Sequence, residues 1–443
     1  MLEEITRQNL GSIRNSTFRH YARIYVDIYE SFLAQVGQFG LPFETDAAPQ
    51  TQIAQERAAL RTLPEIAPRC EGASLVYKRL SPACEVCRQG VNTLTSHISF
   101  RCHRHCFFCF NPNQENFEAH LAQENDWRAE LDAYRRAGQT LTHIALTGGE
   151  PLLHPAECEA FFGLAREYWP GAHLRLYTSG DLLDAAELER LGAAGLDEIR
   201  FSYKMEDDPA LRAKVLANMA LAREYISTVM VEMPVMPDME EEMRALLLRL
   251  DEIGIWGVNL LELCFPYHNA EAFRARGFRL RYPPYRTLYN FWYAGGLPVS
   301  GSEAAALRLL RFAAERKLSL GVHYCSLENK NFGQMYQQNN HPALIPPTVL
   351  FSERDYYLKT VKAFGEDALA VKKLFDKRGN SRYLYEERGG YMQIHPADAA
   401  RLIGRRLELA LSVNVLEERD GTPCLRELKL LRASAADCDP AAL

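Results

Sequence analysis

Three cysteines at short spacing give this sequence its clearest chemical signal. Cys102, Cys106 and Cys109 are separated by three and then by two residues. Thiolates on one short loop can bind an iron–sulfur cluster or zinc, because soft sulfur suits both. No fourth cysteine follows closely, so a cluster bound here has one iron with an open coordination site. The alternative at this point is a zinc site completed by His103, by His105 or by a thiol from elsewhere in the chain.

A second motif follows a helical stretch. The apolar segment His143–Thr147 runs directly into Gly-Gly-Glu-Pro at positions 148–151. Glycines let a ligand approach the backbone, and the carboxylate can accept hydrogen bonds from an ammonium group. The three-cysteine loop followed by this motif resembles the radical S-adenosylmethionine (radical SAM) family, over residues 94–265.

The resemblance implies a cofactor set and a reaction. A [4Fe–4S] cluster on the three cysteines would bind the methionyl amine and carboxylate of S-adenosylmethionine (SAM). One electron then cleaves SAM to methionine and a 5′-deoxyadenosyl radical, which abstracts hydrogen from the substrate. An external donor of the flavodoxin or ferredoxin type is implied. The matching positions are Phe108 near the adenine, Gly148, Gly149 and Glu150 at the methionyl amine, and Thr178 and Ser202 at the ribose or carboxylate.

Strand-like and helix-like segments alternate from 94 to 265, as parallel βα units do. The clearest helix has an apolar stripe from Met239 to Ile253 and ends at Gly254. Six such units predict an α/β fold, a partial (β/α)6 TIM-like barrel with chemistry at the carboxyl ends of its strands. The expected strands are Leu94–Phe100, His143–Thr147, His173–Thr178, Glu198–Lys204, Ser227–Pro234 and Gly257–Cys264.

Polar residues inside these strands are candidates for contact with the substrate. In the fourth strand, Arg200, Ser202 and Lys204 share one face, which we expect to point into the barrel. Glu232 and Glu262 interrupt apolar strands, and buried charge is costly unless it has a partner. Lys204, Glu232 and Glu262 are therefore the catalytic candidates, with solvation at the rim or a structural ion pair as the alternative.

A second pair of cysteines precedes the three-cysteine loop. Cys84 and Cys87 are too few for a tetrahedral metal site, and further ligands could come from Cys70, Cys264 or Cys325. The interpretations are an auxiliary iron–sulfur cluster, a structural zinc or iron site, and free thiols. We favour an auxiliary metal site with Cys84 and Cys87 as ligands.

The chain has 443 residues, which is more than one ordinary domain needs. We expect five regions along it. These are an N-terminal helical region at 1–69, a cysteine-containing linker at 70–93, the radical SAM barrel at 94–265, an aromatic Gly/Pro-rich active-site extension at 266–345, and a small α+β domain at 346–443.

Composition sets the broad class. The apolar fraction of 47% and the charged fraction of 24% are those of a globular protein. A net charge of −6 gives no expectation of nucleic-acid or membrane binding, and no secretory signal is recognisable, so we expect a cytoplasmic enzyme. The aromatic segment after the barrel favours a peptide or protein substrate over a small metabolite. The alternative from another class is a non-catalytic iron–sulfur or zinc protein.

Overall fold

The computed structural model describes residues 2–290 and 295–443, which fall into two compact units. The barrel unit contains residues 40–284 and the described residues among 291–331. The C-terminal unit contains residues up to 39, 285–290 and 332–443, so the expected helical region 1–69 is divided between the units. Residues 291–294 of the expected extension lie outside the described residues. No helix in the described ranges is long and apolar enough to cross a membrane.

The barrel unit is built on a nine-stranded sheet with the order β2-β3-β12-β9-β8-β7-β6-β5-β4. Strands β4 to β9 and β12 are parallel to one another. Strand β3 pairs antiparallel with both β12 and β2. In the described residues β2 and β4 form the two open edges. The strands are β2 (Ile66–Arg69), β3 (Ser74–Tyr77), β4 (Thr93–His97), β5 (His143–Thr147), β6 (His173–Thr178), β7 (Glu198–Ser202), β8 (Thr228–Val235), β9 (Gly257–Glu262) and β12 (Gly321–Cys325), with the short pair β10 (Cys264–Phe265) and β11 (Leu297–Pro298) beside them.

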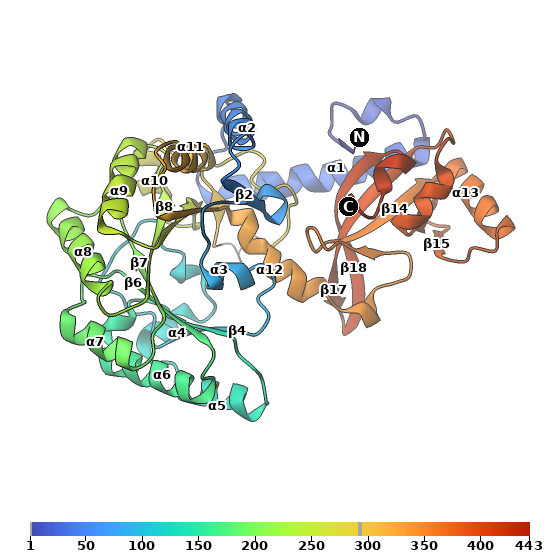
Figure 1. The fold of residues 1–443 in the computed structure, drawn as a ribbon. Coiled ribbons are helices and arrows are strands. Elements are labelled where there is room, and N and C mark those ends of the chain that lie inside the picture. The colour runs from blue at the N-terminus through green and yellow to red at the C-terminus, as the bar shows by residue number, and fades with distance from the viewer. Residues whose placement is uncertain (1, 291–294) are drawn as a thin grey trace. The chain divides into compact units, whose positions relative to one another are not determined.

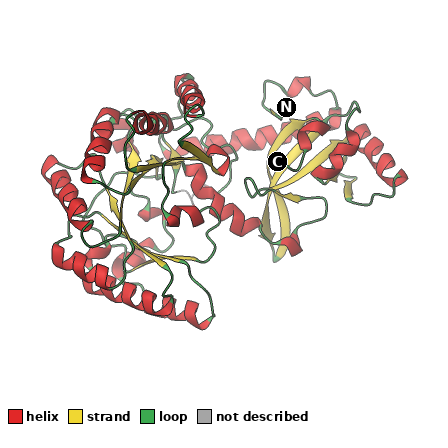
Figure 2. Ribbon diagram, viewed as in Figure 1, coloured by secondary structure: helices red, strands yellow, loops and turns green. Residues whose placement is uncertain are grey.

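Helices between the strands cover the outer side of this sheet (Figure 1, Figure 2). The partial TIM-like barrel predicted from the sequence is confirmed, with each of the six expected strands present. The structure adds β12 as a seventh parallel strand and β2–β3 as an antiparallel extension. The helices are α2 (Ala48–Leu60), α3 (Pro82–Val86), α4 (Phe117–Ala122), α5 (Trp127–Arg136), α6 (Pro155–Tyr168), α7 (Ala185–Ala193), α8 (Pro209–Ala222), α9 (Glu240–Ile253), α10 (Ala270–Ala275) and α11 (Ser302–Glu315), and α12 (Leu327–Asn339) begins in this unit.

Local sequence accounts for the helix ends. The Asp208 side chain accepts hydrogen bonds from the amides of Ala210 and Leu211 at the start of α8, and Pro209 occupies the first turn. Helix α9 ends at Gly254, whose φ of 79° is the left-handed conformation that favours glycine. These caps fix where each helix returns the chain to the sheet.

The C-terminal unit has a seven-stranded sheet with a helix on each face. Along β14, Val361 and Ala363 pack against α13, whereas Phe364 points the other way and stacks on Phe18 of α1 at 4.5 Å. The unit therefore has a separate apolar core on each side of its sheet. Its elements are β1 (Glu3–Glu4), α1 (Ser16–Val36), β13 (Leu350–Phe351), β14 (Leu358–Phe364), α13 (Gly365–Lys377), β15 (Tyr383–Glu386), β16 (Tyr391–Ile394), α14 (Pro396–Ala399), β17 (Leu409–Arg419) and β18 (Thr422–Ala433).

Candidate active site

The predicted cluster-binding and SAM-binding residues lie where the strands of the barrel end. Because β4 to β9 are parallel, their carboxyl ends lie on the same side of the barrel. The three-cysteine loop follows β4, and the Gly-Gly-Glu motif follows β5. Thr178 ends β6, Ser202 ends β7, and Lys204 comes two residues after the end of β7. The parallel order thus brings together residues that are far apart in the sequence.

Three hydrogen bonds join the three-cysteine loop to the Gly-Gly-Glu motif. The amide of Gly149 donates to the Ser99 carbonyl at 3.0 Å, and the amide of Glu150 donates to the Arg101 carbonyl at 2.8 Å. On the far side of the loop, Asn111 Nδ2 donates to the Gly148 carbonyl at 2.7 Å. The two motifs therefore form one rigid structural unit at the sheet edge.

This contact requires glycine. A Cβ atom at Gly149 would lie 2.0 Å from the Arg101 carbonyl oxygen. At Gly148, where φ is 112°, it would lie 2.6 Å from the Ser99 carbonyl oxygen. The glycines thus allow the loop that carries Cys102 to pack directly on the end of β5.

The Glu150 carboxylate is fully hydrogen-bonded within the protein. It accepts from Thr178 Oγ1 at 2.7 Å, from the amide and hydroxyl of Ser179 at 2.7 and 2.6 Å, and from the amide of Leu152 at 3.2 Å. The residue is 2% exposed. Glu150 and Thr178 therefore tie the ends of β5 and β6 together.

Asp181 anchors the other side of the three-cysteine loop. Its carboxylate accepts from His103 Nε2 at 2.8 Å, from Ser179 Oγ at 2.5 Å and from Arg104 Nη1 at 3.4 Å. Burial works against the charge, but the hydrogen bonds from Ser179 and His103 prevail and lower the pKa of Asp181 to about 2. Arg104 also pairs with Asp207. The His103 ring is thus held in place by Asp181 through Nε2.

Cys102 is exposed and Cys106 and Cys109 are partly buried, and all three lie near one cation, Lys204. Burial raises the pKa of Cys102, of Cys109 and of Cys106, the last to about 12. Lys204 acts in the opposite direction on all three. Its Nζ donates to the Ser202 carbonyl at 3.2 Å, and the residue is 8% exposed. Lys204 is therefore placed to bind a negatively charged group beside these cysteines.

The residues present fit a cluster with an open site. Three thiols on one loop match the donor set of an iron–sulfur cluster, and the loop that carries them packs directly on Gly148 and Gly149. Within residues 2–290 and 295–443, no three histidine, cysteine or acidic side chains converge at metal-ligand distances. Phe108 lies partly buried on the same loop, with its ring 5.2 Å from that of Phe107.

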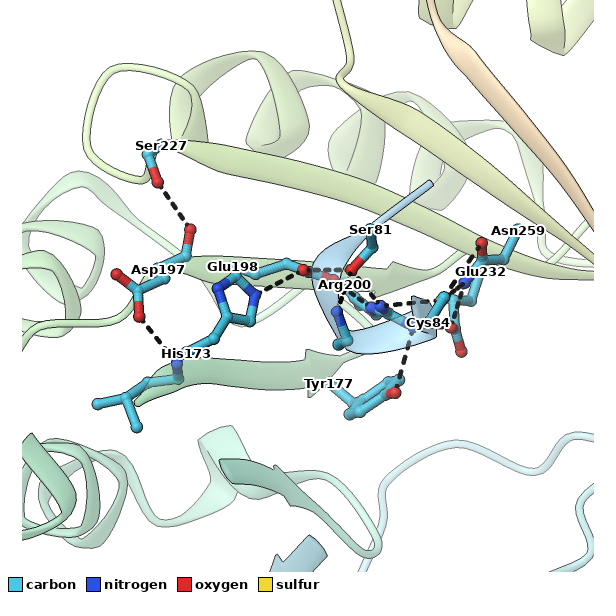
Figure 3. Close-up of polar contacts among 12 residues, drawn as sticks. Ser81, Cys84, His173, Tyr177, Asp197, Glu198, Arg200, Ser227, Glu232 and Asn259 are labelled. Carbon is cyan, nitrogen blue, oxygen red and sulfur yellow. Dashed lines mark hydrogen bonds and ion pairs between the residues drawn. The ribbon is translucent and has the colours of Figure 1, made fainter. Parts of the chain in front are cut away.

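Glu232 belongs to a buried polar network (Figure 3). Arg200 Nη1 donates to Glu232 at 2.5 Å, its Nε pairs with Glu198, and its Nη2 donates to Ser81 Oγ at 2.8 Å. Burial opposes the charge of Glu198, but Arg200 and the hydrogen bond from His173 prevail and lower its pKa to about 2. Figure 3 shows the network continuing along the strands to Cys84.

Glu262 lies in another charge cluster. Arg281 Nη1 donates to Glu262 at 2.6 Å and to Glu303 at 2.7 Å, and Arg57 pairs with Glu303 from the other side. The second oxygen of Glu262 accepts from the amide of Leu327 at 2.9 Å. Burial raises the pKa of Glu262 to about 7. These contacts favour the structural ion pair, the alternative that the sequence left open for Glu262.

The sequence did not single out the residues that hold the loop. Asp181, Asp207 and Asn111 each bind it through a side chain, and none belongs to a recognised motif. A signal was available for Asp181, because it follows Thr178-Ser-Gly directly after the end of β6. Polar residues just past a parallel strand are favoured site positions.

Comparison with known proteins identifies a domain within the barrel unit. Residues 96–250 match the radical SAM superfamily. This part of the chain is a radical SAM domain. A Methanocaldococcus jannaschii protein described as a glycyl-radical enzyme activating enzyme is 26% identical over 302 residues, which is 66% of this chain and 76% of that protein.

Two further matches are more partial. The PqqA peptide cyclase of Gluconobacter oxydans is 33% identical over 112 residues, which is 25% of this chain and 30% of the cyclase. The structure of Streptococcus suis SuiB bound to the precursor peptide SuiA matches with a TM-score of 0.38 and 15% identity. That match covers 60% of this chain and 54% of SuiB, so this chain spans about half the length of that solved structure.

Proposed function

We propose that this radical SAM enzyme reductively cleaves SAM at a [4Fe–4S] cluster on Cys102, Cys106 and Cys109 and modifies a peptide or protein. The observation that carries the proposal is the joint held by three hydrogen bonds between the cysteine loop and Gly148-Gly149-Glu150. That joint fixes the loop with its three thiols against the ends of β4 and β5. When bound, the cluster supplies the electron that breaks a carbon–sulfur bond of SAM.

The chain's own residues have distinct roles in this proposal. The three cysteines hold the cluster, and the Gly148–Glu150 backbone receives the methionyl amino group. Lys204 neutralises the methionyl carboxylate, and we assign Phe108 and Ser202 to the adenosyl part. Asp181 and Thr178 hold these groups in place, and a flavodoxin or ferredoxin supplies the electron. Positioning of this kind is what the protein contributes when a cofactor carries the chemistry.

The reaction is tested by anaerobic reconstitution with iron and sulfide, followed by reduction in the presence of SAM. We expect 5′-deoxyadenosine by liquid chromatography and mass spectrometry, and its loss in Cys106→Ala with the circular dichroism spectrum retained. Cys424→Ser, a partly buried thiol on β18, is the matched control and should keep wild-type product formation. Zinc or a closed cluster on the loop would give no product in the wild type and would refute the proposal.

A polypeptide substrate is supported by the names of two of the curated relatives, which refer to activation of a glycyl-radical enzyme and to cyclisation of a peptide. The test uses cell extract of the source organism, divided by ultrafiltration. We expect the macromolecular fraction to increase 5′-deoxyadenosine formation, and protease treatment to abolish the increase. Stimulation confined to the filtrate and insensitive to protease would instead identify a small metabolite.

A further inference from the structure

Four cysteines outside the three-cysteine loop gather in the barrel unit. Cys70 begins the short 3-10 turn between β2 and β3, Cys84 and Cys87 lie on and just after α3, and Cys325 ends β12. We call Cys70, Cys84, Cys87 and Cys325 the four-thiol group. None of them has a role in the SAM cleavage proposed above.

Backbone pairing brings these elements together. Cys325 lies opposite Ser74 in the β3–β12 pair, and the amide of Ser326 donates to the Ala73 carbonyl at 3.4 Å. Cys70 is only four residues before Ser74, at the turn of the hairpin. The Cys70 and Cys325 segments are therefore neighbours.

An ion pair joins the segment that carries Cys84 and Cys87 to the segment that carries Cys70. Arg69 pairs with Glu85 at 2.7 Å. Arg69 precedes Cys70 in the chain, and Glu85 follows Cys84, so this contact joins the two cysteine-bearing segments directly. Cys87 comes one helical turn after Cys84, so α3 presents two thiols to the same region.

The thiols also lie near enough to one another to interact electrostatically. Cys70 interacts with Cys87, and Cys87 interacts with Cys84. Cys325 interacts with both Cys84 and Cys87. The main electrostatic partners of Cys264, by contrast, are Lys330 and Glu262. Of the three additional ligands that the sequence offered, the structure selects Cys70 and Cys325.

Polar hydrogens point at the sulfur atoms. Arg200 Nη2 lies 3.4 Å and Asn259 Nδ2 lies 3.5 Å from Cys84 Sγ (Figure 3), and Asn329 Nδ2 lies 3.3 Å from Cys325 Sγ. Such donors stabilise thiolates, whereas a thiol that only fills a core needs apolar neighbours. Side-chain donors therefore face two of the four sulfur atoms, those of Cys84 and Cys325.

Backbone strain marks the turn that presents Cys70. The φ angles of Cys70, Glu71 and Gly72 are 48°, 52° and 79°, so three consecutive residues are left-handed. Residues other than glycine rarely adopt this conformation, and such strain concentrates at functional sites. The strained turn is explained if the Cys70 side chain must be held in one position.

We propose that Cys70, Cys84, Cys87 and Cys325 form a second metal centre, a four-thiolate site for a thiophilic metal. Four sulfur ligands suit iron, an iron–sulfur cluster or zinc, and in each case the metal displaces the thiol protons. In the described residues, the cysteine side chains of this group are not close enough together to bind one metal ion, and the same is true of the three-cysteine loop. Metal binding at either site therefore entails rotation of the cysteine side chains. The inference goes beyond SAM cleavage and stands independently of it.

The experiment uses the full chain with Cys102, Cys106 and Cys109 all replaced by alanine, which removes the first site. The protein is reconstituted anaerobically with iron and sulfide, or with zinc, and metal and acid-labile sulfide are measured after desalting. We expect this variant to retain a metal centre and to lose it when Cys84→Ala and Cys87→Ala are added. In the same background, Cys325→Ala should lose the metal, whereas the matched control Cys264→Ala should retain it.

Each outcome decides for or against the site. Iron with equimolar sulfide identifies a cluster, and iron without sulfide or zinc identifies a single-metal site; either supports the four-thiolate proposal. A metal-free triple variant with a native circular dichroism spectrum overturns it. So does equal metal loss in Cys264→Ala, or a disulfide within the four-thiol group by mass spectrometry. Failure of the wild type to form 5′-deoxyadenosine would refute the proposed function and leave this site untouched.

Discussion

At the scale of single residues, the packing of Gly149 against the cysteine loop leads to a direct test. Gly149→Ala places a methyl group 2.0 Å from the Arg101 carbonyl oxygen, so the loop must move. We expect 5′-deoxyadenosine formation to fall by at least about tenfold, because small displacements of reacting groups are costly. The measurement is product formation per reconstituted cluster.

The matched control for this substitution is Gly163→Ala in α6. A Cβ atom at Gly163 meets nothing within 4 Å. This change should leave product formation at the wild-type level and stabilise the helix by about 0.5–1 kcal/mol. Equal activity in the two variants would mean that the close contact at Gly149 has no role in positioning the cluster loop.

Lys204 provides a test of charge at the same edge. Lys204→Gln removes the cation that faces the three cysteines, so we expect SAM affinity to fall by roughly tenfold or more. Iron and sulfide content should be unchanged, since the thiols remain. Lys214→Gln, an exposed position on α8 with the same charge change, should bind SAM as the wild type does. Unchanged SAM affinity in Lys204→Gln would exclude Lys204 from the site.

At the scale of elements, Glu198 joins β7 to β6 and to the segment before α3. It accepts hydrogen bonds from His173 Nε2 at 2.8 Å and from Ser81 Oγ at 2.7 Å, and it pairs with Arg200. Its pKa is about 2 in the folded protein, against 4.5 for a free side chain. The ionised form is therefore favoured by folding, and the stabilisation is present above pH 4.5 and lost as the pH falls toward 2.

The lowered pKa of Glu198 gives a prediction for the stability of Glu198→Gln. At pH 7 the variant should be less stable by about 3 kcal/mol, the equivalent of a shift of two to three pKa units. The difference from the wild type should shrink as the pH is lowered from 5 toward 3, because Glu198 becomes protonated in the unfolded chain while it stays ionised in the folded protein. Urea unfolding at several pH values measures it. A difference that stays constant over this range would show that Glu198 is not the titrating group.

The elements of the barrel were largely predictable from the sequence, and their extension was not. Strands β4 to β9 are recognisable in the sequence as short apolar runs between helices, which is a local pattern. Strand β12 and the hairpin β2–β3 pair across more than 240 residues, as Tyr77 with Val322 shows, and no local pattern specifies that partner. For the same reason the sequence paired Cys84 with Cys87 but could not choose among Cys70, Cys264 and Cys325.

The candidate site shows the same division. Motifs of consecutive residues, such as the three cysteines and Gly148-Gly149-Glu150, could be recognised directly. The side chains that hold them could not, because Asp181 reaches His103 across 78 positions of the sequence. Strand parity put Arg200 on a polar face, and Glu232 was recognised as an acid within an apolar strand. Whether such a residue meets a substrate or another charge depends on its neighbours in space.

At the scale of the whole molecule, the two units have separate apolar cores. In the C-terminal unit, Phe375 is fully buried beneath the sheet among residues of that unit alone. In the barrel unit, Phe162 of α6 is fully buried behind the parallel strands. The proposed SAM and metal ligands all belong to the barrel unit. A chain with two separate cores, only one of which belongs to a unit that binds ligands, is expected to depart from two-state unfolding.

We therefore expect two thermal transitions in the full chain. Phe375→Ala and Phe162→Ala should each cost about 3–5 kcal/mol, because each leaves a cavity in a packed core. Each should lower a different transition in scanning calorimetry. SAM added to the reconstituted protein should raise only the transition that Phe162→Ala lowers, since a ligand stabilises the part of the structure that binds it. A single transition that both variants lower and SAM raises would instead mean that the two cores unfold together.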